Sequence, residues 1–159
     1  MRARSCAALA LVALLAACEG WFGGEEAARI PLQPVAGGGF EPVRILLRPQ
    51  MNAVAFDLHA DFAWSRREEA GRWDRYRATL SAGGRTIQTA EFSVNSPEPE
   101  DAAGPRSPPP TGLRQLLFVV DLRAEDEYEL AIVALQSPVV TLESPQLVVR
   151  INVPPAGRP

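Results

Sequence analysis

The stretch Asn52–Ala63, NAVAFDLHADFA, has the most regular alternation of apolar and polar side chains in the chain. One row of this stretch consists of Val54, Phe56, Leu58, Ala60 and Phe62, and the other consists of Ala55, Asp57, His59, Asp61 and Ala63. Successive side chains of a β-strand point to opposite faces of its sheet. A period of two over ten residues therefore predicts a strand with one buried and one solvated face. Such a face needs a second layer to cover it, which favours a layered β fold.

Further strands are predicted on both sides of this one, at Val43–Arg48, Arg75–Ser81, Arg85–Val94, Leu113–Leu122, Glu127–Leu135 and Gln146–Val153, with a short strand at Val139–Glu143. Gly83-Gly84 indicates a hairpin turn. The 15 prolines and 12 glycines favour turns over long helices. We therefore expect an all-β domain, an antiparallel immunoglobulin-like or transthyretin-like β-sandwich of seven or eight strands. It would span residues 43–153, with a Pro-rich loop at 95–112 and a disordered tail at 154–159.

The chain begins with a basic patch followed by an apolar run. Arg2 and Arg4 precede Cys6–Ala17, twelve residues without a charge. A bilayer span needs roughly 20 apolar residues, so this run is too short to cross a membrane. Its length and its flanks are typical of a secretory signal peptide, which we expect over residues 1–17.

The run ends in Leu15-Ala16-Ala17-Cys18, which resembles the lipobox of bacterial lipoproteins. The resemblance implies cleavage between Ala17 and Cys18, diacylglycerol on the Cys18 thiol, and an anchor in the membrane. The alternative is ordinary cleavage that leaves Cys18 free. Glu19, in place of Asp, is similar to the outer-membrane sorting pattern, which implies an outer-membrane location facing the periplasm. The strand pattern also resembles uncharacterised proteobacterial lipoproteins with one small β-sandwich.

Residues 18–42 predict the lipidated cysteine followed by a flexible tether, because glycine and proline are frequent there. The alternative for part of this segment is a short edge strand that contains Ile30, Leu32 and Val35.

Charge and cysteine content exclude several classes of function. The formal net charge is −3, and without Arg2 and Arg4 it would be −5, which is unfavourable for nucleic-acid binding. The chain has no lysine, so Schiff-base and phosphate-loop lysines are excluded. Both cysteines lie within the first 18 residues, so we expect no disulfide, no thiolate metal site and no cofactor.

Asp57, His59 and Asp61 would share one face of the predicted strand. Two carboxylates and an imidazole are candidate ligands for a divalent metal, or candidates for positioning a general base. The alternative is a solvated face on which the two aspartates pair with Arg75 and Arg77 of a neighbouring strand. The alternative is favoured, because the chain has no second histidine.

A second group of candidates mixes arginine with tryptophan and consists of Trp64, Arg66, Arg67, Arg72, Trp73, Arg75 and Arg77. Such side chains bind anionic lipid headgroups or glycans when they converge on one surface. The alternative is a salt-bridged surface loop, since Glu68, Glu69 and Asp74 lie among them.

Motifs of common enzymes, such as Gly-x-Ser-x-Gly and His-Glu-x-x-His, are absent from the sequence. We therefore expect a non-catalytic lipoprotein that acts in the periplasm as a binding or assembly module, with an envelope protein or glycan as partner. The alternatives are a module that binds an anionic envelope lipid or glycan, and a metal-assisted enzyme built around Asp57, His59 and Asp61.

Overall fold

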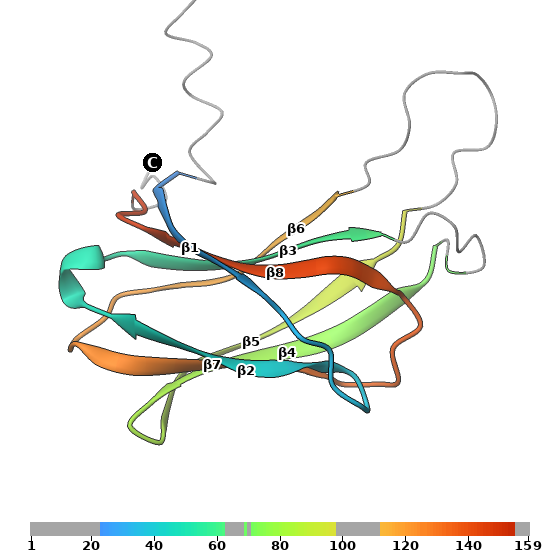
Figure 1. The fold of residues 1–159 in the computed structure, drawn as a ribbon, viewed down its shortest axis with the longest axis horizontal. Coiled ribbons are helices and arrows are strands. Elements are labelled where there is room, and N and C mark those ends of the chain that lie inside the picture. The colour runs from blue at the N-terminus through green and yellow to red at the C-terminus, as the bar shows by residue number, and fades with distance from the viewer. Residues whose placement is uncertain (1–22, 63–68, 70, 98–111, 155–159) are drawn as a thin grey trace, which may run out of the picture.

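The computed structural model describes residues 23–62, 69, 71–97 and 112–154, which form two antiparallel four-stranded sheets packed face to face (Figure 1). The elements are β1 (Glu25–Pro31), β2 (Gly39–Leu47), the 3-10 turn η2 (Pro49–Met51), β3 (Val54–Phe62), β4 (Trp73–Ala82), β5 (Arg85–Asn95), β6 (Gly112–Val120), β7 (Asp126–Ala134) and β8 (Leu142–Ile151). The strand orders are β1-β8-β3-β6 and β2-β7-β4-β5. The all-β, antiparallel sandwich predicted from the sequence is confirmed.

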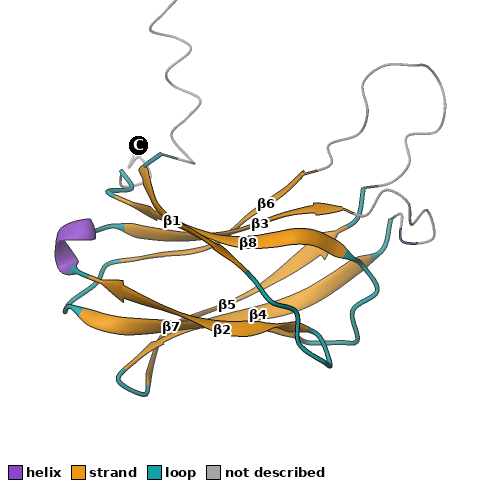
Figure 2. Cartoon of the chain, in the orientation of Figure 1, coloured by secondary structure: helices purple, strands orange, loops and turns teal. Residues whose placement is uncertain are grey.

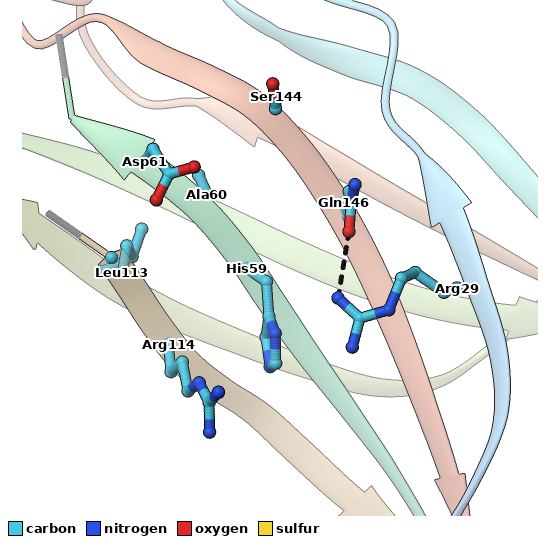
Figure 3. Close-up of a pocket in the computed structure, with 9 residues that line it drawn as sticks. Arg29, His59, Ala60, Asp61, Leu113, Arg114, Ser144 and Gln146 are labelled. Atoms are coloured by element: carbon cyan, nitrogen blue, oxygen red, sulfur yellow. Dashed lines mark hydrogen bonds between the residues drawn. The ribbon is translucent and has the colours of Figure 1, made fainter.

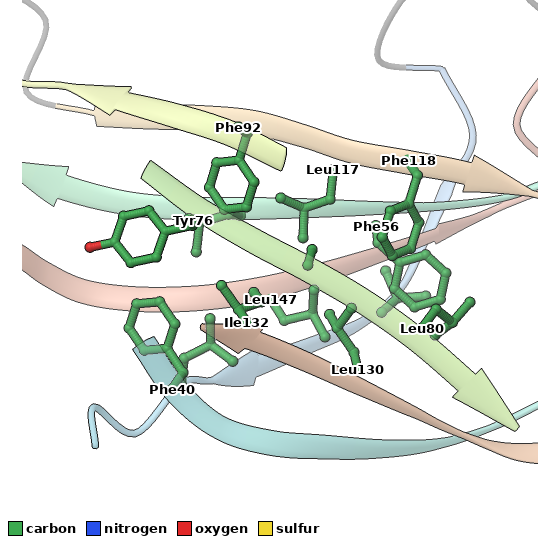
Figure 4. Close-up of a cluster of buried hydrophobic side chains, with 14 of the residues drawn as sticks. Phe40, Phe56, Tyr76, Leu80, Phe92, Leu117, Phe118, Leu130, Ile132 and Leu147 are labelled. Carbon is green, nitrogen blue, oxygen red and sulfur yellow. The ribbon is translucent and has the colours of Figure 1, made fainter. Parts of the chain in front are cut away.

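The alternation in β3 places its apolar row in the core between the sheets. Val54, Phe56 and Leu58 are completely buried, and β3 pairs with β8 on one side and β6 on the other. The core in Figure 4 contains one group of aromatic rings from each sheet, Phe40, Tyr76 and Phe92 from one and Phe56 and Phe118 from the other. The ring centroids of Phe56 and Phe118 lie 5.4 Å apart, at an angle that suits aromatic packing. The apolar row of β3 therefore forms the centre of one sheet's inner face.

The β4–β5 hairpin follows the prediction closely. Its turn contains Gly83 and Gly84, both with positive φ, which glycine adopts without steric cost. Tyr76, Ala78 and Leu80 of β4 are buried, as their alternation predicts.

The short separate strand predicted at Val139–Glu143 is wrong, because β8 begins only at Leu142. The preceding residues form a loop that the buried Asp74 holds by accepting hydrogen bonds from the Val139 and Val140 amides, each at 2.9 Å to one carboxylate oxygen. The Asp74 carboxylate therefore satisfies two backbone amides that would otherwise need the backbone hydrogen bonds of a strand pair.

The predicted flexible tether over residues 18–42 is wrong from Glu25 onward, because β1 pairs with β8 from Glu25↔Ile151 to Pro31↔Gln146. Ala28 and Ile30 pack against the core and Leu32 is buried. Proline is compatible with an edge strand, so Pro31 does not prevent the pairing. The alternative of an edge strand with Ile30, Leu32 and Val35 is right in kind, but β1 lies earlier in the chain and contains only Ile30 of the three.

The second half of the expected tether also belongs to the fold. Phe40 is buried, and β2 begins at Gly39, four residues before the predicted strand. A Cβ at Gly39 would lie 2.5 Å from the Ile132 carbonyl oxygen of β7. Glycine at this position therefore allows β2 to approach β7 closely.

One end of the sandwich carries Gly23, η2 and the connection at 121–125, and we name it the η2 end (Figure 2). Asn52 joins two connections there, because its Nδ2 donates to the Leu122 carbonyl at 2.8 Å and its Oδ1 accepts from the Leu122 amide at 2.7 Å. The opposite end carries the turn between β1 and β2 and the loop before β8.

Several predicted segments lie outside the described residues. They are the signal peptide at 1–17, Cys18, residues 98–111 of the Pro-rich loop and residues 155–159 of the tail. These assignments stay predictions.

Candidate functional site

The outer face of the sheet β1-β8-β3-β6 contains a hollow of about 580 Å³, which we name the His59 hollow (Figure 3). All four strands of this sheet contribute side chains to it. The residues used in the argument below are Arg29 of β1, His59 and Asp61 of β3, Arg114 of β6, and Ser144 and Gln146 of β8. Its lining is polar, which suits a ligand that carries charge or hydrogen-bonding groups.

A buried ion pair lies beside the hollow, on the same face of the sheet. Arg150 Nε donates to Asp57 Oδ2 at 2.8 Å, and Arg150 Nη2 donates to Asp57 Oδ1 at 3.2 Å. Both side chains are buried, and Arg150 Nη1 also donates to the Gly23 carbonyl. The pair therefore connects β3 and β8 to the segment that precedes β1.

This pair corrects the expected solvated row of Asp57, His59 and Asp61. Asp57 is completely buried, His59 is half-buried and Asp61 is exposed. The row differs in burial because β3 lies inside its sheet, where Arg150 of β8 covers Asp57. The predicted pairing of the aspartates with Arg75 and Arg77 is also wrong, because β3 and β4 belong to different sheets.

The three residues also do not form a metal site. Within the part of the chain that the structure describes, no group of three or more His, Cys, Asp or Glu side chains is placed to hold a metal ion. The physical reason is that both oxygens of Asp57 are already occupied by Arg150.

His59 lies in the middle of the hollow, directly opposite Arg114 of β6 and Gln146 of β8 in the strand register. Burial lowers the pKa of the His59 imidazole below its ordinary value, because a charged ring loses hydration there. Asp57 opposes this shift, whereas the positive charges of Arg114 and Arg29 lower the pKa further. The imidazole is therefore neutral near pH 7 and can both donate and accept a hydrogen bond.

The two arginines of the hollow differ in their partners. Arg29 is bound by Glu26, with its Nη2 2.7 Å from Glu26 Oε2, and its Nη1 donates to Gln146 Oε1 at 3.0 Å. Arg114 has no ion pair with any residue that the structure describes. The Arg114 guanidinium is therefore the cation of the hollow whose charge is not already balanced by a carboxylate.

The arginine and tryptophan candidates that the structure describes lie outside the His59 hollow. Trp64, Arg66 and Arg67 lie outside the described residues, and Arg72 is exposed. Arg75 and Arg77 both bind Glu91 of β5, at 2.8 Å each, on the outer face of the second sheet. Arg75 and Arg77 are therefore ion-paired on strand β4, with Glu91 as their carboxylate, and do not belong to the expected salt-bridged loop.

Trp73 is also exposed, and it shares the outer face of β4 with Arg77, which lies opposite the exposed Val133 of β7. Leu135, which follows β7 and donates its amide hydrogen bond to the Arg75 carbonyl, is exposed as well. This exposed apolar group lies beside Arg75 and Arg77.

Sequence reasoning missed Arg29, Arg114, Ser144, Gln146 and Arg150. They lie on three strands separated by up to 121 positions along the chain, and strand pairing brings them together. Their local patterns carry no signal for a site, although Arg150 has one clue: it is a charged residue at the end of the apolar run Leu147–Val149.

No protein-family model, curated protein or solved structure matches the chain. Among the described residues, no helix has the length and apolar character needed to span a bilayer.

Asp57→Ala tests the buried ion pair. The substitution leaves the buried Arg150 guanidinium without its counter-charge, so we expect the free energy of unfolding to fall by about 3–5 kcal/mol in urea titrations. The double variant Asp57→Leu/Arg150→Met should lose less than Asp57→Ala, because it buries no uncompensated charge. Glu91→Ala, which removes an exposed carboxylate, is the control and should have a much smaller effect. A double variant less stable than Asp57→Ala would contradict this account.

His59 is the only histidine, so its ring protons give a single set of NMR signals. We expect a titration midpoint below the ordinary value of about 6.5. The unfolded chain then binds this proton at a higher pH than the folded chain does. The free energy of unfolding should therefore fall as the pH drops from about 6.5 towards the folded-state pKa. His59→Gln should lose this part of the pH dependence, and a midpoint above 6.5 would contradict the prediction.

Proposed function

We propose that the chain is a lipid-anchored envelope lipoprotein, attached to the outer membrane through Cys18, whose sandwich acts in the periplasm as a non-catalytic binding module. The lipobox at Leu15–Cys18 supports the anchor. The binding role rests on one observation, the side-by-side position of His59 and Arg114 on the adjacent strands β3 and β6 in the lining of the His59 hollow.

The ligand chemistry follows from these side chains. The planar guanidinium of Arg114 matches a phosphate or carboxylate, with which it can form two parallel hydrogen bonds. An anion beside His59 would offset the positive charges of Arg114 and Arg29, which now disfavour protonation of the imidazole. Gln146 and Ser144 add neutral groups that can orient the ligand. We therefore assign the hollow to an anionic group of an envelope lipid or glycan.

The non-catalytic part of the proposal rests on the surroundings of the histidine. A general base is usually oriented by a second polar group, often a carboxylate. Among the described residues no carboxylate is hydrogen-bonded to His59, because Asp57 is bound to Arg150 instead.

Assembly with an envelope protein is the second candidate function. The exposed group of Trp73, Val133 and Leu135 beside Arg75 and Arg77 favours it, since aromatic side chains and arginine are enriched at protein interfaces.

Cys18→Ala tests the anchor. We expect the variant to remain an uncleaved precursor, or to be lost from the membrane fraction, because it lacks the thiol that receives the lipid. Mass spectrometry of the mature wild-type protein should find a diacylglycerol thioether at Cys18. An unmodified Cys18 in the mature protein would refute lipid anchoring.

Sulfate tests the anion site, because it stays fully ionised through the titration range of histidine. At matched ionic strength, sulfate in place of chloride should raise the NMR pKa of His59, since a bound anion stabilises the imidazolium. Arg114→Gln should abolish this shift. Arg85→Gln is the matched control, because it removes an equal charge from the exposed β4–β5 turn, and it should leave the shift intact.

A His59 pKa that does not respond to sulfate in the wild-type protein would refute the anion site. A response lost equally in Arg114→Gln and Arg85→Gln would show general charge screening and would refute it as well. If the anion site fails and a partner protein is recovered reproducibly from native envelopes, the assembly function replaces it.

A further inference from the structure

Gly23 and Gly24, at the start of the described chain, are held against the sandwich by specific contacts. The Gly23 carbonyl accepts a hydrogen bond from Arg150, and Gly24 has a φ of +102°. A Cβ at Gly24 would lie 2.7 Å from the Ile151 carbonyl oxygen and 2.9 Å from Val153 Cγ2. The backbone at Gly23 and Gly24 is thus packed against Ile151, the last residue of β8, and Val153, which follows it, at the η2 end.

Only a short segment of the chain connects Gly23 to Cys18, the proposed lipid anchor. Cys18 and Gly23 are five residues apart, so they span at most about 18 Å whatever the conformation between them. The headgroup layer of one leaflet takes up about 5–7 Å of this length. If Cys18 is lipidated, Gly23 can rise no more than about 12 Å above the headgroups.

We propose that the η2 end faces the anchoring bilayer, and that the His59 hollow lies on the side of the sandwich, distant from the headgroups of that bilayer. This inference rests on the lipid anchor of the proposed function. Arg150 lies next to Gly23, whereas Gln146 of the hollow lies four residues further along β8, a distance of about 13 Å. The hollow therefore lies towards the opposite end of the sandwich from the anchor.

Charge does not favour adsorption of the whole face that carries the hollow over the end-on orientation that a lipid on Cys18 would impose. Asp61 of β3 lies opposite Glu143 of β8, and both are exposed on the outer face that carries the hollow. These two carboxylates are repelled by anionic lipids and offset the attraction of Arg114 on the same face, so this face gains little from lying flat on the bilayer.

The η2 end is itself acidic, with Asp121, Glu125, Asp126 and Glu127 against Arg48 and Arg123. The lipid, rather than charge, therefore holds this end near the membrane. It follows that the anionic ligand of the hollow comes from the periplasmic side and is not a headgroup of the anchoring leaflet.

Single cysteines can test the orientation in the full lipidated protein. Cys6 leaves with the signal peptide and Cys18 becomes a thioether, so an introduced cysteine is the sole thiol. We choose Ala124→Cys at the η2 end, Val139→Cys at the opposite end, and Arg114→Cys and Thr89→Cys on the two outer faces. Each is labelled with a thiol-reactive fluorophore and placed in vesicles of phosphatidylethanolamine and phosphatidylglycerol that carry a headgroup quencher.

The label at position 124 should lose most of its fluorescence, and the label at 139 should keep nearly all of it. The labels at 114 and 89 should be quenched to a similar, smaller extent. Equal quenching at 124 and 139 would overturn the inference, and so would strong quenching at 114 with little at 89, since the hollow would then face the bilayer. Wild-type protein is the control: if it takes up label, Cys18 is a free thiol and the proposed anchor itself has failed.

Discussion

The buried ion pair between Asp57 and Arg150 joins β3, β8 and the start of the described chain at Gly23 on one side of this sandwich. Taking two charges out of water is costly, and the paired hydrogen bonds at 2.8 and 3.2 Å offset that cost. Ala55 and Val148 lie on the same outer face and are buried as well. Long arginine side chains can cover such small apolar groups with their methylene stems while the charged end meets a carboxylate. The outer face of this sheet is therefore closed in part by its own charged side chains.

The strand pattern of the sequence predicted the fold class because it depends on local alternation. Phe56 and Leu58 alternate with polar neighbours, and burial of one row follows directly. The same pattern could not predict what covers the other row. Asp57 and Arg150 are 93 positions apart, and only the pairing of β3 with β8 brings them together. Local periodicity therefore shows which residues of a strand share a face of the sheet. Whether that face is exposed to solvent depends on the strands and side chains that long-range pairing brings next to it.

The first strand shows a related limit. Glycine and proline around residues 23–42 favoured a tether, although Ala28, Ile30 and Leu32 alternate as in a strand. An edge strand tolerates proline and needs pairing on one side only, so composition is a weak guide there. His59 was found as a candidate because it is unique, but its neighbours Arg29 and Arg114 reach it from strands on either side in the sheet order. Arg75 and Arg77, which are only two positions apart in the sequence, share the single carboxylate of Glu91 instead.

The position of β1 also has a consequence for the order of folding. This strand pairs with β8 alone, and more than 100 residues separate the two along the chain. Contacts between such distant segments form late, because closing a long loop costs conformational entropy before the stabilising contacts have formed. We therefore expect β1, the first strand to be synthesised, to pair only after β8, the last strand, has been made. A chain interrupted before β8 would lack both the partner strand of β1 and the counter-charge of Asp57. In such a chain β1 and β3 would each have an unpaired edge, which proteases and chaperones of the cell can recognise.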